Sequence, residues 1–157
     1  MIDRRVCGWL LILSVWLGCA AGSARAAATR EMHLEAILVW GTNDPKPKDR
    51  DLKELETELS KKLCKAAPYK WKNYFEVNRK TIKVAPKTLG KLVVSEHCQL
   101  EIQNLGEERL EVKLIGDGKA VSKHSESLPA DHIFVLSGPA TNDAAWLVIL
   151  RQVPDKK

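Results

Sequence analysis

The chain has 157 residues and a formal net charge of +5. Its apolar, charged, glycine and proline fractions lie in the ordinary globular range, so one domain with a modest core is expected. The first residues do not belong to that core, and without them the net charge falls to about +3. A weakly basic balance of this size favours a solvated surface over a patch for anionic lipid or polysaccharide.

The N-terminus has the pattern of a secretory signal peptide. Arg4 and Arg5 form a positive n-region, Val6 to Ala21 is largely apolar, and Ala24-Arg25-Ala26 supplies small residues for cleavage. About sixteen apolar residues fall short of the roughly twenty that span a bilayer. We therefore expect residues 1–26 to be removed (cleavage after Ala28 is the later option) and the protein to be periplasmic or extracellular.

A second interpretation applies to the same segment, because Leu17-Gly18-Cys19 resembles the end of a bacterial lipobox. Trp16 departs from that motif, which usually has an aliphatic residue there. If Cys19 were acylated, the protein would be a membrane-tethered lipoprotein, and a substitution at Cys19 would decide between the two.

Cys64 and Cys98 are the only cysteines outside the targeting segment. In an oxidising compartment they can form a disulfide that stabilises the fold by about 3 to 4 kcal/mol. The alternative is two unpaired thiols that behave as small buried hydrophobes.

The first predicted element of the mature chain is a strand over Met32 to Trp40. Its later half is continuously apolar, which is typical of a central strand covered on both faces. Gly41 to Lys48 contains glycine and two prolines and is predicted to be a surface loop.

A helix is predicted from about Leu52 to Cys64, capped by Asp49 or Asp51. Leucines recur at three- and four-residue spacing, so the helix should dock one face on a sheet. Pro68 ends this pattern. These leucines are Leu52, Leu55, Leu59 and Leu63.

The segment Tyr69 to Val84 alternates again and interleaves lysines with aromatic residues. Lysine and aromatic side chains together could bind nucleic acid or glycan. Period two places most aromatics on one face and the lysines on the other, so we expect core aromatics and solvated lysines, with no nucleic-acid partner. Tyr74 falls on the lysine face. A kink or a turn is expected at Asn78 to Lys80, before a short strand Thr81 to Val84.

The clearest alternation runs from Leu92 to Lys119. It predicts an antiparallel hairpin whose inner face carries Cys98 and apolar residues, with a turn over Asn104 to Glu108. Gly116 to Lys119 predicts a tight turn into a further strand, Lys119 to Lys123. The inner-face residues are Cys98, Leu100, Ile102, Leu110, Val112 and Leu114.

Two apolar strands, His132 to Ser137 and Ala144 to Val153, end the domain. The fold class predicted from these elements is mainly β (α+β): seven or eight mostly antiparallel strands in a two-layer β-sandwich with one amphipathic helix. The domain is expected over residues 29–154, followed by a basic tail at 155–157.

Catalytic, cofactor and metal motifs are missing from the sequence. The four histidines are widely spaced, and His97 and Cys98, as neighbours in a strand, point to opposite faces. Glu101 and Glu111 lie on the predicted solvent face, where they are better explained as charge partners of lysine and arginine than as a hydrolytic pair.

The leading functional hypothesis is an exported, non-enzymatic cell-envelope protein that binds another protein or stabilises an assembly, using a sheet edge or its loops. The surface favoured for this comprises Thr42, Asn43, Asp44 and Tyr74. The alternative is a carbohydrate or surface-polymer binder, which requires two aromatics exposed on one surface. A small hydrolase is third. The aromatic candidates are Trp40, Trp71, Tyr74 and Trp146.

Overall fold

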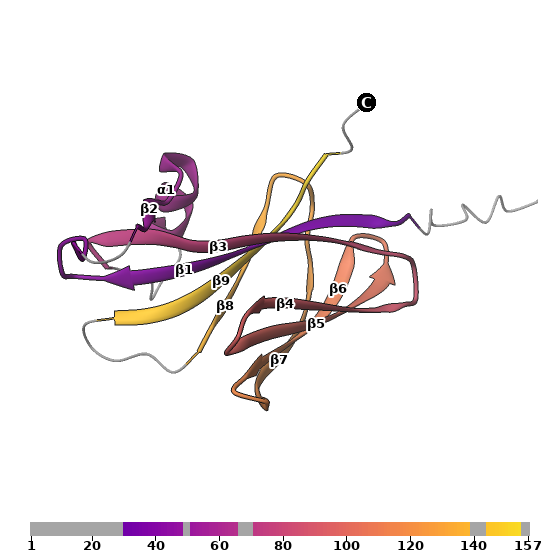
Figure 1. The fold of residues 1–157 in the computed structure, drawn as a ribbon. Coiled ribbons are helices and arrows are strands. Elements are labelled where there is room, and N and C mark those ends of the chain that lie inside the picture. The colour runs from indigo at the N-terminus through magenta and orange to yellow at the C-terminus, as the bar shows by residue number, and fades with distance from the viewer. Residues whose placement is uncertain (1–29, 49–50, 66–70, 139–143, 155–157) are drawn as a thin grey trace, which may run out of the picture.

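The computed structural model describes residues 30–48, 51–65, 71–138 and 144–154, and this part of the chain is mostly β with one helix. The strands form two antiparallel sheets: sheet A, in the order β2-β3-β1-β9-β8, and sheet B, in the order β4-β5-β6-β7 (Figure 1). The elements are β1 (Met32–Thr42), β2 (Lys53–Glu54), α1 (Thr57–Lys65), β3 (Asn73–Val84), β4 (Leu89–Ser95), β5 (Cys98–Gly106), β6 (Arg109–Gly116), β7 (Lys119–Ser127), β8 (Ile133–Ser137) and β9 (Ala144–Gln152).

The predicted central strand is confirmed, because β1 lies between β3 and β9 in sheet A. Its alternate residues Leu34 and Ala36 face sheet B, whereas Ile37 and Val39 face the helix side. The sheet therefore has a cover on each face, α1 on one and sheet B on the other (Figure 1). Two covered faces explain why this strand is continuously apolar rather than alternating.

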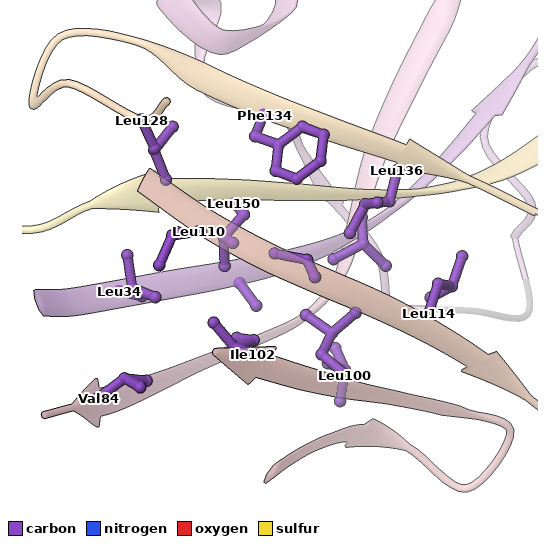
Figure 2. Close-up of a cluster of buried hydrophobic side chains, with 14 of the residues drawn as sticks. Leu34, Val84, Leu100, Ile102, Leu110, Leu114, Leu128, Phe134, Leu136 and Leu150 are labelled. Carbon is purple, nitrogen blue, oxygen red and sulfur yellow. The ribbon is translucent and has the colours of Figure 1, made fainter. Parts of the chain in front are cut away.

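The main core lies between the two sheets, where side chains from both converge (Figure 2). The inner face predicted for the hairpin is confirmed: Leu100 is opposite Leu114 and Ile102 is opposite Val112. Leu100, Ile102 and Val112 have no exposed surface. Burial of such side chains contributes roughly 1.5 to 3 kcal/mol each, which makes this cluster the main source of stability.

The helix is shorter than predicted. It begins at Thr57, and the N–H of Ser60 donates to the carbonyl of Glu56 at 2.9 Å, so Glu56 rather than an aspartate occupies the N-cap position. The preceding residues Lys53 and Glu54 pair with β3 instead. Leu52 and Leu55, on either side of this pair, fit a helical spacing. The edge of β3 nevertheless offers backbone hydrogen bonds to Lys53 and Glu54, which these residues could not make to β3 as the first turn of a helix.

Two expectations for β3 are wrong. The strand runs unbroken through Asn78 to Lys80, because its irregularity is a one-residue bulge at Val77 opposite Leu38 and Val39, not a turn. Tyr74 and Phe75 are both buried, with 6% and 3% of their surfaces exposed. Adjacent residues can both be buried only where both faces of the sheet are covered, which strand periodicity alone does not reveal.

The edge strand β7 differs from the rest of sheet B. It is longer than predicted, and every residue in it except Ser122 is exposed. Its side chains beside the core residues Leu110 and Val112 are Glu126 and His124. Polar residues that point inward, together with lysines, protect an edge strand against pairing with other chains.

The predicted signal peptide, Cys19 and the basic tail all lie outside the described residues. None of the described residues form a helix with the length and apolar character needed to cross a membrane.

Candidate functional site

A groove of about 630 Å³ opens between the two sheets at the end where β5 starts and β6 ends. Leu38, Trp146 and Val148 line it from sheet A, and Cys98 and Leu114 line it from sheet B. One bulge residue of each sheet also reaches it, since Val77 of β3 and Val121 of β7 are on its wall. Its size and largely apolar lining are those of a ligand-binding site.

The groove exposes apolar surface that a sealed core would not. The side chains at its mouth, Val77, Val121 and Trp146, are 36%, 40% and 45% exposed. Single exposed hydrophobic residues are common on proteins, but three that line one concave site form a patch. This patch is the strongest indication of binding in the described part of the chain.

A polar pair forms one part of the rim. Nδ1 of His97 donates to Oδ1 of Asp117 at 2.6 Å, and the N–H of Asp117 donates to the carbonyl of His97 at 3.1 Å. The two hairpin turns beside the groove are thereby fastened to each other. Both side chains are largely exposed, so they can also offer hydrogen bonds to a ligand.

An aromatic row continues from the groove along sheet A. Trp146 and Trp40 are register partners whose rings stack at 6.3 Å between centroids and 24° between planes. Trp40 also contacts Phe75 at 6.0 Å. Of the tryptophans named as glycan candidates, Trp40 and Trp146 therefore share a surface.

The other aromatic candidates lie elsewhere. Trp71 and Tyr74 belong to the cluster under α1 and meet edge-on at 6.4 Å. Trp71 packs so closely on Gly41 that a Cβ there would lie 2.9 Å from the ring, which explains the glycine. Burial raises the pKa of Tyr74, whose hydroxyl accepts a hydrogen bond from the N–H of Trp71.

The structure brings Thr42, Asn43, Asp44 and Tyr74 close together but does not expose them all. Thr42 is fully buried, and its Oγ1 accepts from the N–H of Asp44 at 3.1 Å. Oδ1 of Asn43 accepts from the N–H of Lys72, so this residue connects the loop to the start of β3. Of the four, only Asn43 and Asp44 are exposed.

The predicted disulfide is not present, since Cys64 and Cys98 are both free. Cys98 packs against the core between the sheets, whereas Cys64 is on α1, which covers the opposite face of sheet A. The expectation assumed that the helix and the hairpin were neighbours. Sheet A separates them, which a sequence pattern could not show.

The groove chemistry does not resemble that of a thiol nucleophile. Burial raises the pKa of Cys98, which disfavours the reactive thiolate.

The carboxylate Glu101 on the outer face of sheet B is not suited to acid catalysis either. Glu101 contacts Lys113 and Lys91 at 3.3 and 3.4 Å, and the hydrogen bond from Lys113 contributes most to lowering the pKa of Glu101. A general acid needs the opposite shift.

An ion-pair cluster that was not predicted joins α1 to sheet A. Glu35 Oε2 accepts from Arg151 at 2.7 Å and from Arg79 at 3.2 Å. Arg79 also contacts Glu76 at 2.6 Å and Glu56 at 2.8 Å, and Arg151 contacts Glu56 at 3.2 Å. A lone glutamate within the apolar strand β1 was the sequence signal for this cluster.

The apolar groove had no comparable signal, because its residues come from seven strands and include two bulges. Comparison of the chain with protein families, with curated proteins and with solved structures finds no match.

Proposed function

We propose that this protein is a non-enzymatic, exported binding domain of the cell envelope whose groove holds an apolar segment of another protein. The observation that carries the proposal is the groove itself, with Val77, Val121 and Trp146 exposed at its mouth. An open apolar groove with a polar rim suits an amphipathic segment, which can bury some side chains and leave others in water. Export is proposed from the signal-peptide pattern of the first 26 residues.

Site-specific photo-crosslinking in the native envelope tests the proposal. A crosslinking side chain at Val121 lies at the groove mouth, and one at Leu89, 56% exposed on β4, is the matched control because Leu89 does not line the groove. We expect a discrete adduct from position 121 and none from position 89. The Val77→Glu variant should abolish the adduct, since it places a charge in the groove. Equal labelling at both positions, or no adduct, would contradict the proposal.

A carbohydrate ligand is the second candidate, favoured by the exposed Trp146 and by Trp40, which is half-buried and stacked beside it. Sugar rings stack on exposed aromatic faces, and His97 and Asp117 lie on the rim of the same groove. Soluble cell-wall oligosaccharide titrated into the protein should quench tryptophan fluorescence, and Trp146→Phe should remove most of the change. Unchanged fluorescence at saturating oligosaccharide would exclude this candidate.

A further inference from the structure

The charge balance of the ion-pair cluster sets Glu56 apart from its partners. Glu35, Glu76, Arg79 and Arg151 all come from sheet A and together carry no net charge. Glu56, directly before α1, is the fifth and excess member. If Glu56 moved away, two carboxylates and two guanidiniums would remain paired in the sheet. No buried charge would therefore be left without a partner.

The solvent exposure of the side chains also separates Glu56 from the rest of the ion-pair cluster. The side chain of Glu56 is 48% exposed, whereas that of Glu35 is 11% exposed. Ion pairs that reach solvent are screened by salt, and buried pairs are screened much less. Added salt should therefore weaken the contacts of Glu56 before those of Glu35.

Glu56 lies at a position where the loss of its ion pairs would free one end of α1. The residue before it, Leu55, is fixed to sheet A because its N–H donates to the carbonyl of Tyr74 at 3.0 Å. The residue after it starts α1, which packs on the sheet through Leu59 and Leu63. Glu56 is thus the junction between a fixed segment and the helix. Under the helix lie the apolar residues Ile37, Val39, Tyr74, Leu147 and Ile149.

We propose that Glu56 is an ionic-strength-sensitive clamp that holds α1 over this second apolar face of sheet A, and that α1 pivots at Leu55–Glu56 when the clamp is released. The device is separate from the groove, which lies on the other face of the sheet. It gives the protein two states that differ in how much of the face beneath α1 is covered.

Hydrogen exchange of the full chain, followed by mass spectrometry, tests the clamp. Glu56→Gln removes the charge, and Glu58→Gln is the matched control because Glu58 pairs at 3.0 Å with Lys61, which belongs to the helix itself and not to sheet A. In low salt we expect amides of residues 57–65 to exchange about fivefold faster in Glu56→Gln than in the wild type, with β1 and β9 unchanged. Wild type in about 1 M NaCl should match the variant, which should no longer respond to salt.

Three outcomes would overturn the proposal. Equal exchange of the helix in Glu56→Gln and in the wild type would show that the clamp does not hold it. Equal acceleration of exchange by Glu58→Gln would assign the effect to general helix charge. An equal rise of exchange in β1 and β9 would indicate global unfolding rather than a pivot.

Discussion

Replacing Asn104 with alanine should destabilise the fold strongly, because this buried side chain joins three segments of the chain. Asn104 is fully buried at the end of β5, on the face that carries Leu100 and Ile102. Its Nδ2 donates to the carbonyls of Arg30 and Val84, both at 3.0 Å, and its Oδ1 accepts from the N–H of Gly106 at 2.9 Å. One side chain therefore fastens the start of β1, the end of β3 and the β5–β6 turn.

The magnitude follows from these three bonds. Each contributes about 1 kcal/mol net, and the N–H of Gly106 would lose its buried acceptor, so the free energy of unfolding should fall by about 3 kcal/mol. Urea unfolding measures this: with a slope near 2 kcal/mol per molar, the midpoint should drop by roughly 1.5 M. Asn43→Ala is the control, since that exposed side chain makes one loop contact. A loss below about 1 kcal/mol for Asn104→Ala would refute the reasoning.

Three further predictions concern charge, thiols and the sheet edge. Burial raises the pKa of Glu56, but hydrogen bonds from both arginines outweigh it and the net pKa lies below the ordinary 4.5. The stability that this carboxylate contributes is thus complete above pH 4.5 and is lost as the pH falls through the pKa of Glu56 in the folded state. Urea midpoints measured from pH 7 to 3 should therefore decline less in Glu56→Gln than in the wild type. Iodoacetamide should alkylate the exposed Cys64 well before Cys98, because burial raises the pKa of the Cys98 thiol. Equal alkylation rates of the two cysteines, followed by mass spectrometry, would argue against the burial of Cys98. Lys123→Val combined with Glu126→Val should cause concentration-dependent association in light scattering, whereas a persistent monomer would show that these charges do not protect β7.

The sequence predicted the elements better than their arrangement. Alternation fixed the inner faces of β5 and β6, because one side of sheet B is solvated and period two is then preserved. The same rule failed for Tyr74, since sheet A is covered on both faces. Asn104 was assigned to a turn from its neighbours Leu105 and Gly106, yet β5 continues to Gly106 and the turn is Glu107–Glu108, both with positive φ.

The candidate sites were less predictable for a physical reason. The groove depends on how two sheets meet and on bulges at Val77 and Val121, and bulges leave no regular sequence pattern. The disulfide expectation failed because Cys64 and Cys98 are separated by a sheet whose strand order no local pattern encodes. Trp146, an aromatic residue in an apolar strand, could be named in advance as a candidate binding residue, and it lines the groove.

The pairing of β1 with β9 has a consequence for how this protein is made. Sheet B is built from four consecutive strands, each paired with its neighbour in sequence, so it can form from local contacts. The centre of sheet A instead joins the first strand to the last, more than a hundred residues later. Such long-range closure slows folding. A chain still emerging from the ribosome lacks β9 and cannot complete sheet A until this last strand has been made.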